Sequence, residues 1–252
     1  MRNLKYNISE SFNVVRWSLF SVIVSFVAVV GVYKYIDLSN SVSITFSSLE
    51  TVYILLNDSI SIVYIYLPLY LFIICGIMLD DNFGSIEVLK CGSRGKWLTN
   101  KFLTLVFYTI IFFIALFAIN FIISSRVFPY SSKWSTDFVK MQVSMGQEVI
   151  NYTSSPITTI SASLFSLFLI YLFAGTFSMF ISLKTGKESL SLICSLIIGI
   201  GISLLFIIIM ASQKNISIYL LQNLILVMGI CVVFLINYFT AKKKDFNMER
   251  RN

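Results

Sequence analysis

Long apolar runs separated by short polar segments form the main pattern of this chain of 252 residues. Six of the runs hold about 20 or more apolar-dominated residues, the length of an α-helix that crosses a hydrocarbon core of about 30 Å. The predicted spans are Trp17–Ile36, Ser61–Leu79, Phe102–Ser124, Ile157–Leu183, Leu190–Ala211 and Ser217–Ala241. Pro156 suits the first turn of the fourth span, and Pro68 predicts a kink inside the second.

Three shorter segments have apolar residues at helical spacing but are too polar to cross a membrane. Met1–Arg16 is predicted to be an interfacial amphipathic helix, with a disordered tail as the alternative. Ser47–Asn57 and Ser132–Ile150 are predicted to be short amphipathic helices on the outer leaflet or capping the bundle. For these two segments, loop residues packed on the helix ends are the alternative.

Lysine and arginine are concentrated in alternate segments between the spans, which predicts an orientation because cytoplasmic loops carry the excess of positive charge. One set of segments contributes Arg126, Lys133, Lys140 and Lys214. The other set, which includes both termini, contributes Arg2, Lys5, Arg16, Lys90, Arg94, Lys96, Lys101, Lys184, Lys187, Lys242, Lys243, Lys244, Arg250 and Arg251. Both termini are therefore predicted to be cytoplasmic, and residues 125–156 form the larger extracellular segment.

The composition supports an all-α integral membrane protein with one transmembrane domain over residues 1–252. Hydrophobic residues make up 57% of the chain, charged residues 12%, and the mean hydropathy is +0.86, whereas a soluble domain carries about 25% charged residues. The net charge of +7 indicates cytoplasmic loops that face anionic lipid headgroups rather than a nucleic acid. The abundance of Ile, Phe, Asn, Lys and Ser is typical of an AT-rich bacterial genome, so the expected location is a bacterial plasma membrane.

Several kinds of chemistry are missing from the sequence. The chain has no histidine, which excludes Ser-His nucleophiles and His-ligated zinc. No charged residue lies in the middle of a predicted span, which argues against a proton-coupled carrier. The Gly-Lys pair at Gly95 and Lys96 lacks the spacing of a phosphate-binding P-loop. We therefore expect no catalytic site, metal or cofactor in this chain.

The segment Asp80–Phe102, called the elbow below, is a compact charged segment between the second and third spans. Its pattern predicts a short helix over Phe83–Lys90, ended by Gly92 in a left-handed conformation. Ser93 is expected to cap the helix that continues into the third span. Charged residues beside apolar ones at its tip suit a groove on a cytoplasmic partner, and a solvated connector is the alternative.

The elbow resembles the corresponding loop of ABC-2-type permeases, the membrane subunits of ATP-binding-cassette exporters. The residues that carry the resemblance are Phe83-Gly84-Ser85-Ile86-Glu87-Val88-Leu89, Ser93-Arg94-Gly95-Lys96-Trp97 and Lys101-Phe102. The overall architecture also resembles that of these permeases, because the chain is predicted to have an interfacial helix followed by six spans with both ends inside. The resemblance implies a coupling helix that docks on a separate cytoplasmic ATPase, which holds the ATP and magnesium.

Carried over to this sequence, the resemblance makes Glu87, Arg94, Lys96 and Trp97 contact residues for the ATPase. The exposed tip adds Phe83, Ile86 and Lys90 to the same surface. The connection between the fifth and sixth spans, about Ser212–Ile216, is short, unlike that of relatives that export large glycans or lipids. The chain is more similar to small permeases that move peptides, including bacteriocin-immunity exporters and exporters of cytolytic peptides.

Small residues recur every four positions in the fifth span, at Ser191, Ser195, Gly199 and Ser203. Such a stripe lets two helices approach closely, so we expect a subunit interface there with a second permease copy or a paralogue. Packing within the chain is the alternative.

The combined expectation is the membrane subunit of an ATP-driven exporter of amphipathic peptides or a similar amphipath. A non-transporting membrane scaffold or sensor, whose elbow binds a signalling partner, is the alternative from a different class.

Overall fold

The computed structural model describes residues 8, 11–42, 44–75, 77, 91–144, 154–212 and 216–243, and every element in this part of the chain is helical. Their bounds are α2 Val14–Val42, α3 Ser48–Asn57, π-helix η1 Ser61–Tyr66, α4 Leu67–Ile74, α6 Arg94–Ser125, α7 Thr136–Ser144, α8 Pro156–Thr185, α9 Glu188–Ser212 and α10 Ile216–Lys243. Four of the described helices, α2, α6, α8 and α10, are long and apolar enough to cross a membrane. The prediction of an all-helical membrane protein is therefore confirmed at this coarser level.

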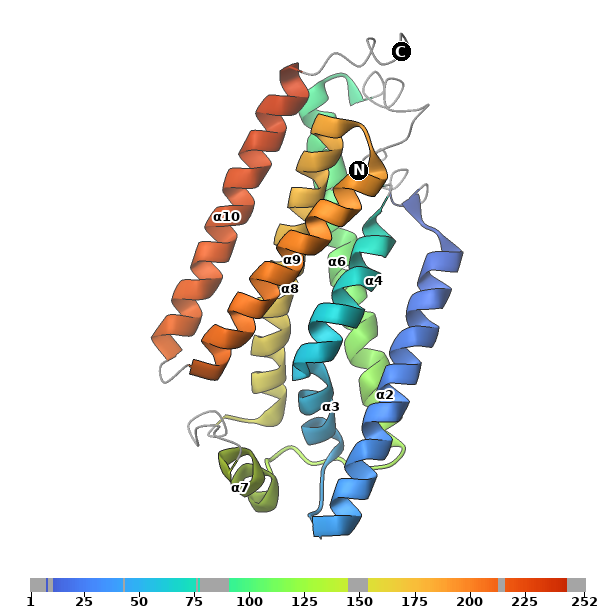
Figure 1. The fold of residues 1–252 in the computed structure, drawn as a ribbon, viewed down its shortest axis with the longest axis vertical. Helices are drawn as coiled ribbons and strands as arrows, with labels where there is room; N and C mark the ends of the chain where they lie inside the picture. Colours follow the sequence, from blue (N-terminus) through green and yellow to red (C-terminus); the bar gives the residue numbers. More distant parts are fainter. Residues whose placement is uncertain are drawn as a thin grey trace.

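The helices form one elongated bundle in which α8 packs on α9 and α10, and α6 lies between α8 and α2 (Figure 1). At one end of the bundle, the upper end in Figure 1, α2, α6 and α9 begin and α4, α8 and α10 end. α7 and the start of α3 lie at the opposite end. Pro156 occupies the first turn of α8, as predicted.

The predicted second span differs most from the structure. α3 and the helix Ser61–Ile74 are together long and apolar enough to cross a membrane, but they meet at a bend of 65°. α3 was predicted as a helix on the outer leaflet or capping the bundle, whereas it packs against α6 and α8 with seven of its ten residues buried. Residues 78 and 79, the end of the predicted span, lie outside the described part.

The predicted kink at Pro68 is wrong, because the helix Ser61–Ile74 continues through this residue and the bend precedes Ser61. Directly before Pro68 the backbone is a π-helix, in which the Leu67 N–H donates to the carbonyl of Ile62. A proline ring in a regular α-helix clashes with the carbonyl four residues earlier. The wider π turn displaces that carbonyl and accommodates the ring.

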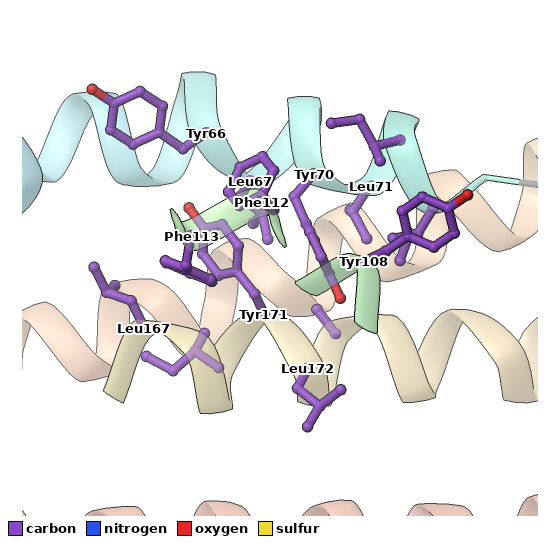
Figure 2. Close-up of a cluster of buried hydrophobic side chains, with 14 of the residues drawn as sticks. Tyr66, Leu67, Tyr70, Leu71, Tyr108, Phe112, Phe113, Leu167, Tyr171 and Leu172 are labelled. Atoms are coloured by element: carbon purple, nitrogen blue, oxygen red, sulfur yellow. The ribbon is translucent and has the colours of Figure 1, made fainter. Parts of the chain in front are cut away.

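Tyrosines and phenylalanines from η1, α4, α6 and α8 form the centre of the core (Figure 2). The hydroxyl of Tyr171 donates to the Ile62 carbonyl at 2.8 Å, and the hydroxyls of Tyr70 and Thr109 share a hydrogen bond of 2.9 Å. The rings of Tyr70 and Tyr171 lie 5.3 Å apart. Because a buried hydroxyl without a partner costs free energy, these bonds tie η1 and α4 to α6 and α8.

The described part of the N-terminal segment lies against α6. The hydroxyl of Tyr108 donates to the carbonyl of Ile8 at 2.9 Å, and Trp17 stacks on the Tyr108 ring. Residues 1–7, 9 and 10 are outside the described residues, so the predicted interfacial helix over Met1–Arg16 stays a prediction.

Glu50 is a fully buried carboxylate at the end of the bundle that holds α7. One carboxylate oxygen accepts from the Ser47 N–H at 2.7 Å, and the Ser47 hydroxyl accepts from the Glu50 N–H at 3.3 Å. The other oxygen accepts from the Ser135 N–H, 85 positions later in the chain. Ser135 in turn caps α7 through a bond from the Phe138 N–H. Glu50 therefore joins the first turns of α3 and α7.

We expect Glu50→Gln to destabilise the protein by about 1.5–3 kcal/mol, since an amide replaces one acceptor oxygen by a donor that faces a backbone N–H. Thermal unfolding in detergent, followed by circular dichroism, measures the loss. Asp37→Asn, an exposed carboxylate on α2, is the matched control and should change stability little. Equal melting temperatures for Glu50→Gln and the control would show that the buried carboxylate does not join the two helices.

Candidate functional site

The part of the elbow from Cys91 onward is described, and it lies at the end of the bundle where α4 ends and α6 begins (Figure 1). Gly92 has the left-handed conformation that its position predicted, with φ of 72°. Ser93 caps α6, because its hydroxyl accepts from the Lys96 N–H at 3.3 Å. The predicted left-handed conformation of Gly92 and the predicted Ser93 cap are therefore confirmed.

The predicted ATPase contacts fall into two groups. Phe83, Ile86, Glu87 and Lys90 lie outside the described residues, as does the predicted helix over Phe83–Lys90. Lys96 is exposed, Arg94 is half-buried and Trp97 is only 2% exposed. The Trp97 side chain packs inside this chain, so we assign it to positioning the start of α6 rather than to a surface contact.

Arg16 fixes the end of α4. Its guanidinium donates to the carbonyl of Cys75 and lies over the ring of Phe72, 5.2 Å from the centroid. A cation at the C-terminus of a helix is favoured by the helix dipole and by the free carbonyls there. The sequence predicts only that Arg16 is one of the cytoplasmic basic residues. A side chain that reaches 59 positions along the chain leaves no local signal.

Arg94 fixes the start of α6 in a similar way. Its guanidinium donates to the carbonyl of Lys242, in the last turn of α10, at 2.8 Å. Gly95 permits the close approach, because a Cβ at this position would lie 2.7 Å from the Tyr238 ring. The helix before the elbow, α4, is thus joined to α2, and the helix that begins in the elbow, α6, is joined to α10.

An open cleft of about 670 Å³ lies between the first turns of α6 and the last turns of α10, and we call it the α6–α10 cleft. Residues of both helices and of the turn before α6 line it: Cys91, Ser93, Arg94, Gly95, Lys96, Thr99, Asn100, Tyr238 and Lys242. The ammonium group of Lys242 lies 5.2 Å from the centroid of the Tyr238 ring. The cleft therefore combines three cationic side chains with small polar ones.

The small-residue stripe of α9 faces the interior of this chain. Ser191, Ser195 and Ser203 are buried, as is Gly199. The Ser191 hydroxyl donates to the Ser178 carbonyl of α8 at 2.7 Å. The stripe is thus used for packing within the chain, the alternative considered above, and a subunit contact through it would require α9 to leave α8.

Comparison with known proteins adds no relative to this picture. No family model matches the chain, and searches of curated proteins and of solved structures found no match.

Two glycines of α9 offer a test of which face is packed inside the chain. A Cβ at Gly199 would lie 2.9 Å from a methyl group of the buried Leu67, whereas at Gly201 it would meet nothing within 4 Å. We expect Gly199→Leu to destabilise the purified protein by about 1–3 kcal/mol through overpacking. Gly201→Leu should leave the melting temperature nearly unchanged. Equal effects of the two substitutions would contradict the packing of the stripe described here.

The close approach of α6 and α10 gives a second test. Gly95→Val should force Tyr238 aside and lower the melting temperature, at a cost of about 1–3 kcal/mol. Tyr238→Ala removes the ring, so the double variant should lose less stability than the two single losses added together. Strictly additive losses in this double-mutant cycle would mean that the two residues do not touch.

Proposed function

We propose that this protein is the membrane subunit of an ATP-driven exporter, with the elbow as the surface on which a separate cytoplasmic ATPase acts. The observation that carries the proposal is the attachment of the helices on both sides of the elbow, α4 and α6, to other helices of the bundle. Arg16 joins the end of α4 to α2, and Arg94 joins the start of α6 to α10. The resemblance of the elbow to that of ABC-2-type permeases supports the same assignment.

Such attachments would allow a force on the elbow to be transmitted to several helices. A force on residues 78–90 would act on α4 and α6, and through Arg16 and Arg94 also on α2 and α10. The buried Trp97 gives the start of α6 a rigid base, since a large packed side chain resists displacement. A flexible connector with no contacts at its ends would absorb the same force without moving the helices.

The proposal takes α3 to α4 as one bent span and α9 as another, which with α2, α6, α8 and α10 makes six. The basic residues Arg16, Arg94, Lys96, Lys184 and Lys242 then lie at one end of the bundle. By the positive-inside rule that end is cytoplasmic. Both termini are then inside and α7 is outside, in the plasma membrane of a bacterium.

ATP and magnesium belong to the partner ATPase in this proposal, and the chain itself is not an enzyme. The cargo is an amphipathic peptide or a similar amphipath, since apolar helices offer burial rather than charge pairing as the driving force. A second permease, identical or paralogous, would complete a conduit, because six helices seldom enclose one wide enough for a peptide.

The test is co-purification from the native membrane in mild detergent, followed by transport in vesicles. An ATP-hydrolysing subunit should accompany the wild-type chain. Glu87→Ala and Arg94→Ala should each lower cargo export about tenfold while the chain still inserts, because truncating a central contact residue of an interface costs more than about 1 kcal/mol.

Arg126→Ala is the control, since this exposed arginine lies at the opposite end of the bundle. It should leave export and ATPase binding unchanged. Full export by both elbow variants would refute the coupling role. Co-purification of a signalling protein in place of an ATPase would favour the scaffold or sensor.

A further inference from the structure

We propose that the α6–α10 cleft binds the phosphate group of an anionic lipid at the membrane surface. The inference goes beyond transport and does not rest on it, because it follows from the charge, shape and surroundings of the cleft alone.

Three cations from two helices line this one cleft. Arg94 and Lys96 come from the first turn of α6, and Lys242 comes from the last turn of α10. None of the described lining residues is acidic. An anion is attracted to such a concentration of positive charge.

The surrounding contacts hold the cations in place. The guanidinium of Arg94 is anchored on the carbonyl of Lys242, and the ammonium of Lys242 rests over the ring of Tyr238. Ser93, Thr99 and Asn100 add hydroxyl and amide groups to the same walls. Guanidinium and ammonium groups with neighbouring polar donors are the usual partners of phosphate in proteins.

The apolar surface next to the cleft identifies the phosphate as that of a lipid. On α6, the lining residues Lys96 and Thr99 share a helical face with Leu103 and Phe107, both of which are exposed. Because an exposed apolar stripe leads away from the cleft along the helix, an acyl chain has a surface to lie on.

The same arrangement occurs on α10. Lys242 shares a helical face with Phe239 and Leu235, and both apolar side chains are exposed. Tyr238, with an apolar ring and a polar hydroxyl, suits the boundary between headgroups and acyl chains. Basic pockets between the ends of membrane helices are known recognition sites for anionic headgroups. A free phosphate would use the cations but neither apolar stripe.

The experiment measures lipid retention by the full-length chain in detergent, using native mass spectrometry with added phosphatidylglycerol. Each lysine near a membrane surface contributes about the same amount to the attraction of anionic lipid. The double variant Lys96→Ala/Lys242→Ala should therefore retain phosphatidylglycerol about tenfold or more weakly than wild type. Phosphatidylcholine, which has no net charge, should be retained equally by both proteins.

The matched control is Lys184→Ala/Lys187→Ala, which removes the same charge from exposed positions around the α8–α9 connection. The control should retain phosphatidylglycerol like wild type. Equal loss in both double variants would overturn the site and leave a general charge effect. Thermal stabilisation by inorganic phosphate as strong as that by phosphatidylglycerol would overturn the assignment to a lipid.

Discussion

Polar groups inside an apolar bundle must find partners within the protein, and the rest of this structure depends on that constraint. A membrane offers no water to compensate an unpaired group in its core. At two points where its helices begin or are irregular, the chain supplies such partners from distant segments. Glu50 serves the first turns of α3 and α7, and the Tyr171 hydroxyl serves a carbonyl of the π-helix. Each bond joins segments far apart in sequence, so satisfying local irregularity also fixes the tertiary arrangement.

The same principle links the fold to the candidate site. Where α4 ends, its last carbonyls would be left without partners, and Arg16 from α2 supplies a donor. Where α10 ends, Arg94 from α6 does the same. These two arginines satisfy helix ends and at the same time connect the helices that flank the elbow, α4 and α6, to the rest of the bundle. The structural requirement and the mechanical connection are therefore met by the same side chains.

The sequence predicted what depends on local backbone chemistry. Gly92, Ser93 and Pro156 mark helix boundaries because each favours or forbids a particular backbone conformation at its own position. Ser47 and Glu50 have the spacing of a capping box, which is a local signal for the start of α3. The second partner of Glu50, Ser135, could not be predicted, because nothing local specifies a contact 85 positions away. The face of α9 that carries Gly199 shows the same limit: small residues predict close helix packing but not which helix approaches.

The π-helix before Pro68 has a consequence for the orientation of the core. A π segment holds an extra residue compared with an α-helix of the same number of turns, and one residue corresponds to about 100° of rotation around the axis. The direction in which each side chain of α4 points around the helix axis therefore depends on the position of the extra residue. The hydroxyl of Tyr171 on the Ile62 carbonyl holds it in register. The hydrogen bond from α8 is therefore one of the contacts, together with the packing of Tyr70 and its neighbours, on which the face of α4 that points into the bundle depends.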